Sequence, residues 1–482
     1  MSFLGNFLSF LIPLTMGFLI VSVFWPKGGP SFSDVLLKCC LSVGFGFGSS
    51  SCLVFVWMMT VGRLTRGMFI LELMLLAGLS VLFICRRRVS ISTTTEQLED
   101  NSIPSFSKPY FLRLAVALAA LSAVVSFLYL SLQNPHGQFD AYAIWNLRAR
   151  FLYRGGDYWT HYTYMIWSHP DYPLLIPASI AGSWEFIGRE TQLIPIVIGL
   201  LFTFATIGVV AVSISRLHGE RQGLLAGLIL LGTPYLIIHG ASQYADVPLS
   251  FFFAATVALL FFHAESPSKK NFLILAGMAA AFSAWAKNEG ILFLVLLFLS
   301  HFAVTTLAKG RKNWRSEMVA LLLGASPVIA VVIIYKLSLA ASNDVIGAQG
   351  LGSTVPKLLD ISRYHLVASQ FGKGLFSFGR WSPTFTVPLL LFFYFLLLGT
   401  NIEKKFVATT SIVVLLPVFM MVGYFFLYIL SPHDLAQHLE TSLSRLLLQV
   451  WPLAILAYFA IVQAPERAVS SETIRTKSCG VT

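Results

Sequence analysis

Long apolar stretches recur along the whole chain, and they constrain the fold more than any other feature. In lipid, a helix satisfies its own backbone hydrogen bonds, and about 20 apolar residues cross the roughly 30 Å of hydrocarbon. We predict thirteen such helices, at about 7–25, 35–60, 68–85, 111–132, 192–215, 222–239, 246–264, 271–287, 289–308, 317–340, 384–399, 406–430 and 444–463. The sequence therefore predicts an all-α polytopic membrane protein.

The composition supports this fold class. Hydrophobic residues make up 56% of the chain and charged residues only 11%, whereas soluble domains carry about 25% charged residues. The first stretch, 7–25, could be a signal peptide, but it lacks a basic start and an Ala-x-Ala-like cleavage site. We therefore interpret it as a helix of the protein.

Basic residues fall on alternate connections, which predicts the orientation of the chain. Clusters such as Arg86 to Arg88, the segment 309–315 and the pair Lys404 and Lys405 lie on one side. Connections rich in Lys and Arg face the cytoplasm, so the amino terminus is expected outside and the carboxyl terminus inside. The net charge of +11 thus reports topology and gives no reason to propose a nucleic acid partner.

The connections divide the chain into unequal parts. We expect an N-terminal three-helix block (1–88), a polar cytoplasmic linker (89–110), a transmembrane catalytic body (111–463) and a cytoplasmic tail (464–482). The body has three long outer connections, at 133–191, 341–383 and 431–443. The first of these is expected to contain helices that lie at the membrane interface, including the apolar part 172–187, because Trp and Tyr concentrate at that depth.

Polar residues far apart in sequence are predicted to meet at the outer face. Ionisable groups near a bilayer are costly unless they are solvated or paired, so their gathering suggests a cavity. The five clusters are Asp140, His169 with Asp171, Tyr244 with Asp246, Lys287 with Glu289, and the stretch from His433 to Arg445.

Each cluster also has a purely structural interpretation. Asp140 and Asp246 could cap the helices that begin after them, since Asp is a favoured N-cap. Lys287 and Glu289 could form an interfacial pair across a tight turn. His169 and Asp171 could order a proline-flanked loop, and Arg445 could reach the lipid headgroups. The spacing of His433 and His438 is weak evidence for metal, so no metal site is predicted and a divalent cation is left open.

At these residues the chain resembles C-type (GT-C) membrane glycosyltransferases of the protein-mannosyltransferase and aminoarabinose-transferase kind. That family has an acidic residue directly after a core helix, then juxtamembrane helices, then a second Asp in a very short outer loop. Asp140, the segment 148–153 and Tyr244-Ala245-Asp246 follow this order. The resemblance covers 111–310 well and 384–463 more loosely. Many relatives have Asp-Glu at the first position, whereas Ala141 follows Asp140 here.

The resemblance implies a function. A sugar would pass from a polyprenyl-phosphate donor to an unknown acceptor (lipid, glycan or protein) at the extracytoplasmic face of the cell (inner) membrane, with inversion. Asp140 would be the base, and a departing phosphate needs fixed positive charge. We therefore predict Asp140 and Asp246 as catalytic residues. The predicted substrate-binding residues are Trp145, Arg148, His169, Asp171, Tyr244, Lys287, Glu289, His433 and Arg445.

Two other classes of function remain open from the sequence. A transporter or flippase of lipid-linked sugars would also need polar groups near lipid, but it should place them at mid-membrane in broken helices. A noncatalytic assembly subunit would tolerate the loss of Asp140.

Overall fold

The computed structural model describes residues 2–26, 31–88, 109–165, 169–309, 311–341, 351–382 and 386–465. These residues form an all-helical structure without a named strand. The helices of the first half are α1 (Ser2–Phe24), α2 (Phe32–Val61), α3 (Met68–Arg88), α4 (Tyr110–Gln133), η1 (Ala141–Trp145), α5 (Asn146–Arg154), η2 (Gly156–Tyr164), α6 (Leu175–Ile187), α7 (Leu193–His218), α8 (Glu220–Leu231) and α9 (Pro234–Ala241). Those of the second half are α10 (Asp246–Glu265), α11 (Asn271–Ala286), α12 (Asn288–Lys309), α13 (Arg311–Ser338), α14 (Leu351–Leu359), α15 (Ile361–Ser377), α16 (Val387–Leu398), η4 (Lys404–Phe406), α17 (Val407–Leu430) and α18 (Leu435–Ile461).

The predicted polytopic membrane fold is confirmed, but the count of thirteen spans is not. Ten of the described helices are long and apolar enough to cross a membrane, and α8 with α9 gives an eleventh if this pair, bent by 62°, is one span. The other two predicted stretches coincide with α11 and α16, which have only 16 and 12 residues. At 1.5 Å per residue these two helices are shorter than the hydrocarbon layer.

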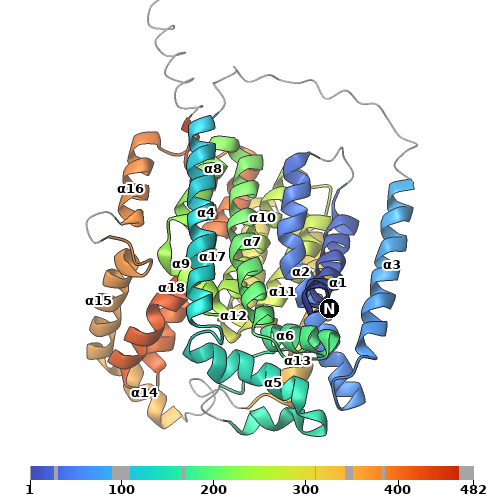
Figure 1. Ribbon diagram of the computed structural model, residues 1–482. Helices are drawn as coiled ribbons and strands as arrows, with labels where there is room; N and C mark the ends of the chain where they lie inside the picture. Colours follow the sequence, from blue (N-terminus) through green and yellow to red (C-terminus); the bar gives the residue numbers. More distant parts are fainter. Residues whose placement is uncertain are drawn as a thin grey trace, which may run out of the picture.

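Helix α10 is the centre of the bundle. Its membrane-spanning window is completely buried, while those of α3 and α4 are mostly exposed. In Figure 1, α3 stands at the edge of the molecule and α4 runs along its front. An apolar helix that is hydrophobic all round is buried in protein or faces lipid, and these three helices show the two outcomes. Close packing uses glycine between α1 and α2, because a Cβ at Gly46 would lie 2.0 Å from the Pro13 carbonyl oxygen.

The first long connection folds into helices at one end of the bundle. η1, α5, η2 and α6 succeed one another there, opposite the end at which α4 begins (Figure 1). α6 has 13 residues, too few to span a membrane, as predicted for 172–187. It packs against α2 and α5, and most of its residues are buried.

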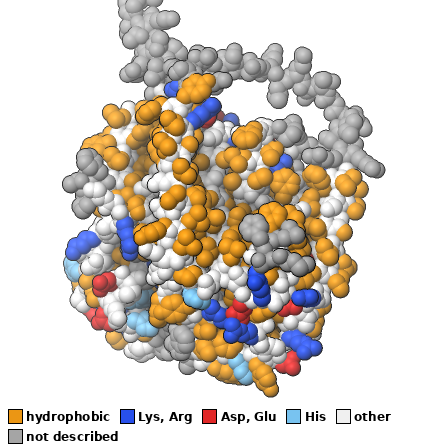
Figure 2. Space-filling model, viewed as in Figure 1, with side chains coloured by type: hydrophobic (Ala, Val, Ile, Leu, Met, Phe, Trp, Pro, Cys, Tyr) orange, Lys and Arg blue, Asp and Glu red, His pale blue; other side chains and the backbone are white. Residues whose placement is uncertain are grey.

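Side-chain chemistry changes along the bundle. Hydrophobic side chains cover most of the visible face, and charged and His side chains gather toward the end that carries α5 (Figure 2). Such a belt suits a protein surrounded by hydrocarbon at mid-height. The predicted linker 89–110 and tail 464–482 lie almost entirely outside the described residues.

Candidate active site

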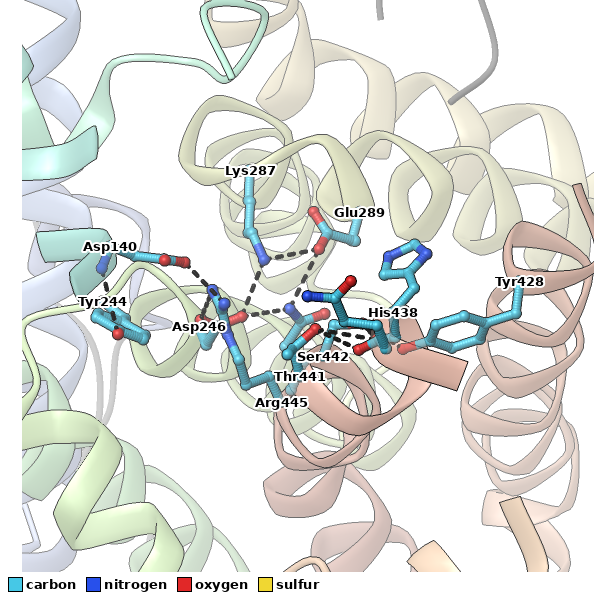
Figure 3. A network of polar contacts seen from close by, with 12 residues as sticks. Asp140, Tyr244, Asp246, Lys287, Glu289, Tyr428, His438, Thr441, Ser442 and Arg445 are labelled. Carbon is cyan, nitrogen blue, oxygen red and sulfur yellow. Dashed lines mark hydrogen bonds and ion pairs between the residues drawn. The ribbon is translucent and has the colours of Figure 1, made fainter. Parts of the chain in front are cut away.

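Asp140 lies between the end of α4 and the short π-helix η1. Its backbone amide donates a hydrogen bond to the Tyr244 hydroxyl, 3.3 Å away, and its side chain makes no capping hydrogen bond. The structural interpretation of Asp140 as an N-cap is therefore not supported. Single π turns are frequent at functional sites, and this one directs the carboxylate toward α18 (Figure 3).

Asp246 begins α10 and is completely buried, yet it does not cap the helix either. Its Oδ1 lies 3.0 Å from Lys287 Nζ, and its Oδ2 lies 3.0 Å from Arg445 Nη2. The preceding connection is tight, because Gln243 adopts a left-handed backbone with a φ of 61°. A non-glycine residue keeps such a conformation only where its surroundings enforce it.

Arg445 of α18 joins the two predicted catalytic carboxylates. Its Nη1 lies 2.7 Å from Asp140 Oδ2, while Nη2 contacts Asp246 (Figure 3). The guanidinium also lies over the ring of Tyr244, 4.8 Å from the centroid. Burial raises the pKa of Tyr244 to about 12, and the nearby Asp140 carboxylate adds to the rise. The Tyr244 hydroxyl therefore stays protonated at neutral pH.

Lys287 is the single residue between α11 and α12, and Glu289 lies in the first turn of α12. Lys287 Nζ lies 2.8 Å from Glu289 Oε1 in addition to its contact with Asp246. The lysine is only 3% exposed, so solvent does not weaken its ion pairs with Asp246 and Glu289. These contacts bring Asp140, Asp246, Lys287, Glu289 and Arg445 into one network (Figure 3).

Two residues of this network were not predicted from the sequence. The Gln449 side-chain amide donates to Asp246 and to Glu289, and the Tyr424 hydroxyl donates to Gln449 Oε1 at 2.7 Å. Gln449 stands in an otherwise apolar stretch of α18. A polar residue inside a membrane segment is costly unless another polar group pairs with it. The isolated Gln449 in this apolar stretch was therefore a sequence signal for a polar partner.

Exposure distinguishes the two carboxylates. The side chains of Asp140 and Arg445 are 19% and 18% exposed, whereas that of Asp246 is inaccessible. An incoming molecule can therefore reach Asp140 and Arg445 directly. Asp246 acts beneath them as a buried counter-charge.

Four other predicted site residues, Trp145, Arg148, His169 and Asp171, form or contact the loop 169–174 before α6. Arg148 is fully buried and its guanidinium donates to the backbone carbonyls of His169 and Tyr172. Trp145 is also fully buried and stacks on the Tyr172 ring. Asp171 accepts a hydrogen bond from Asn288, the residue after Lys287. The contacts of these residues order the loop, so we do not carry them into the proposed function as substrate contacts.

The histidines of the third outer connection lie to one side of the network. His433 and His438 face each other with ring centroids 5.5 Å apart, and His438 Nδ1 lies 2.8 Å from Ser431 Oγ. Within the described ranges, no group of three or more His, Cys, Asp or Glu side chains is arranged to hold a metal ion. Asp246 already has protein donors at both oxygens.

A large apolar groove opens on the face of α18 opposite Arg445, because its lining residues Leu447, Val450 and Trp451 lie two, five and six residues after Arg445. It has a volume of about 1070 Å³ and is lined by α15, α16, α17 and α18. Leu447, Val450 and Trp451 of α18 form one wall, a short distance along the same helix from Arg445. Val422 and Phe426 on the opposite wall are 47% and 43% exposed, so the groove faces the surroundings of the bundle.

A comparison with known protein families matches part of the chain. Residues 171–335 match the family model of the dolichyl-phosphate-mannose-protein mannosyltransferases. The matched segment contains Asp246, Lys287 and Glu289, while Asp140 and Arg445 lie on either side of it. No curated protein and no solved structure matches the chain. The match indicates glycosyltransferase activity with a polyprenyl-phosphate sugar donor, and it confirms over 171–335 the predicted resemblance to C-type membrane glycosyltransferases of the protein-mannosyltransferase kind.

Proposed function

We propose that the protein transfers a sugar from a polyprenyl-phosphate donor to an acceptor hydroxyl at the outer face of the cell membrane, with inversion at the anomeric carbon. The observation that carries this proposal is the ion pair of Asp140 with Arg445, the two most exposed charged groups of the network. A base for the acceptor and a cation for the leaving phosphate are thus side by side.

Asp140 serves as the general base. As the acceptor oxygen forms its bond to the anomeric carbon, its proton passes to the Asp140 carboxylate. The bond from the anomeric carbon to the phosphate oxygen breaks, and the electron pair leaves with polyprenyl phosphate. A positioned base of this kind contributes about 10²–10⁴-fold to the rate.

Arg445 binds the phosphate, and Lys287 supports it from below. The departing phosphate gains negative charge, which a fixed guanidinium stabilises without donating a proton to it. Lys287 is too buried to meet the donor directly, but its charge lies on the far side of Asp246. Asp246 holds both cations in place, so its role is positioning and not proton transfer.

The apolar groove between α15 and α18 binds the hydrocarbon part of the donor. Its described lining is formed by aliphatic and aromatic residues, which suits a polyprenyl chain. α18 carries both the groove wall and Arg445, and Trp451 follows Arg445 by about 9 Å at 1.5 Å per residue. The groove wall and Arg445 lie on opposite faces of α18, so the phosphate of a donor chain in the groove passes around this helix to reach the guanidinium.

Transport of a lipid-linked sugar explains the geometry less well. The break between α8 and α9 is the kind of broken helix found in transporters. However, the charged network is formed by Asp140, by residues at the ends of α10, α11 and α12, and by Arg445 about three turns into α18, and none of these lies at this break. Catalysis at one face accounts for that placement.

The direct experiment uses the purified protein in nanodiscs with a panel of polyprenyl-phosphate sugars. Release of polyprenyl phosphate should require both one specific donor sugar and an added acceptor. Asp140→Asn should abolish the release. Movement of intact donor between leaflets, without any release by the wild-type protein, would establish transport and refute the proposal.

A further inference from the structure

Besides the apolar groove, the protein has a smaller pocket that is lined largely by polar residues. It has a volume of about 240 Å³ and is formed by the turn after α4, by α5 and by the connection from α6 to α7. Its polar lining residues are His136, Asn146, Arg150, Arg154, Glu190, Thr191 and Gln192, with Trp184 among the apolar ones. Water occupies about 30 Å³ per molecule, so this volume suits one sugar ring and excludes a long chain.

Asn146, which lines the pocket, carries an unsatisfied hydrogen-bond acceptor. Asn146 is only 2% exposed, and its Nδ2 donates to the His136 carbonyl and to Gln243 Oε1. Its Oδ1 is buried and has no protein hydrogen-bond donor. Leaving such an atom unpaired is unfavourable.

The pocket is also positively charged. Glu190 accepts two hydrogen bonds from Arg154, one at each carboxylate oxygen. Arg150 must share the same carboxylate and reaches it only at 3.6 Å, while its Nη2 lies 3.5 Å from His136 Nδ1. Two guanidinium groups therefore face one carboxylate. The Arg150 side chain is 28% exposed, which leaves it accessible to an anion.

Hydrogen bonds link the residues of this pocket to the proposed active site. Gln243 accepts from Asn146 and donates to the Pro135 carbonyl, both of which line the pocket. The next residue, Tyr244, holds the backbone of Asp140. Asn146 follows Asp140 by six residues, at most about 9 Å along a helix axis. A short oligosaccharide could therefore occupy the pocket and present a hydroxyl near Asp140.

We infer that the pocket formed by Asn146, Arg150 and Glu190 binds an acidic sugar, a ring that carries a carboxylate or a phosphate, as part of the acceptor. Arg150 binds the acidic group. The pocket itself follows from the contacts above. Its assignment to the acceptor rests on the proposed function.

The test measures binding and needs no transfer. Glucuronate, glucose 6-phosphate, neutral glucose and inorganic phosphate are titrated against the purified protein in phosphatidylcholine nanodiscs, with saturation-transfer NMR as the readout. At least one acidic sugar should bind about ten-fold or more tightly than glucose and than phosphate. Preference for glucuronate would assign a carboxylate, and preference for glucose 6-phosphate would assign a phosphate.

A matched pair of variants locates the binding. Arg150→Gln should weaken binding of the acidic sugar to the level of glucose, and Arg150→Lys should retain part of it. Arg113→Gln removes a similar partly exposed Arg–Glu pair at the far end of α4 and should change nothing. Unaltered thermal unfolding of Arg150→Gln would show that the loss is local.

Three results would overturn the inference. They are equal binding of acidic and neutral sugars, phosphate binding as tightly as any sugar, and undiminished binding by a folded Arg150→Gln variant. Binding of an acidic sugar by a protein that transfers no sugar would refute the proposed function but leave the pocket assigned. Sugar transfer by a protein that binds no acidic sugar would refute the pocket assignment but leave the proposed function standing.

Discussion

The guanidinium of Arg445 lies 2.7 Å from the carboxylate of Asp140, although 305 positions separate the two residues in sequence (445 − 140). Arg445, which we propose to bind the donor phosphate, thus holds Asp140, the proposed base. A donor phosphate competes with Asp140 for Arg445. We therefore expect donor binding to loosen this pair and to leave the carboxylate open to the acceptor hydroxyl.

Arg445 should matter most for use of the donor. Replacing Arg445 with Gln removes a charge-assisted contact worth about 2–5 kcal/mol, so KM for the donor should rise at least about 30-fold, while Arg445→Lys retains part of the contact. Steady-state kinetics with a varied donor concentration measures the effect. Lys373→Gln on α15 removes an exposed charge outside the network and serves as the control. A normal donor KM for Arg445→Gln would show that Arg445 only orders the structure.

Asp246 should matter most for stability. Asp246→Asn leaves Lys287 and Arg445 partly uncompensated in a buried position, and breaking a buried pair costs about 3–5 kcal/mol. Thermal unfolding in detergent should occur at a clearly lower temperature. The double variant with Lys287→Gln should recover part of the loss, because it also removes one uncompensated charge. An Asp246→Asn protein as stable as the wild type would argue against the positioning role.

The fold was largely predictable because hydropathy acts residue by residue along the chain. All thirteen predicted stretches coincide with helices or with the bent pair α8 and α9. The predicted number of spans was too high because hydropathy alone did not show that α11 and α16 are shorter than a membrane-spanning helix. The break before α9 had a signal in the sequence, Gly232-Thr233-Pro234, because Pro favours the first turn of a helix.

The donor groove should distinguish long from short lipid chains. Val422→Trp fills part of the groove on α17, so transfer from long-chain polyprenyl donors should weaken by about ten-fold or more relative to short-chain analogues. Val414→Trp adds the same ring to the same helix outside the groove lining and should not change the ratio. Equal sensitivity of the two variants, or none, would remove the groove from the donor site. Paired assays with two chain lengths provide the measurement.

The proposed orientation predicts accessibility in whole cells. A cysteine at Ser353, an exposed position of α14 at the end of the bundle that carries α5, should react with a membrane-impermeant thiol reagent. A cysteine at Ser316, near the start of α13, should react only after permeabilisation. All five native cysteines are replaced first; the four described ones, Cys39, Cys40, Cys52 and Cys85, are free thiols. The opposite labelling pattern would place the proposed active site in the cytoplasm.

The site was only partly predictable from the sequence. Asp140, Asp246, Lys287, Glu289 and Arg445 do meet, as predicted from their places near helix ends on one face of the bundle. Burial is a property of the assembled bundle, so the sequence could not show that Arg148 and Trp145 are sealed inside the first outer segment. Asn146 was missed for a related reason, because the importance of its amide depends on the partners that packing brings to it.

The most direct measurement of the central claim is the transfer rate of Asp140→Asn. Asn is nearly isosteric with Asp but cannot accept a proton, so turnover should fall at least about 10²-fold, with the protein still folded and still binding donor. Asp140→Ala should fall at least as far. Near-normal transfer by the folded Asn variant would contradict the assignment of Asp140 as the base.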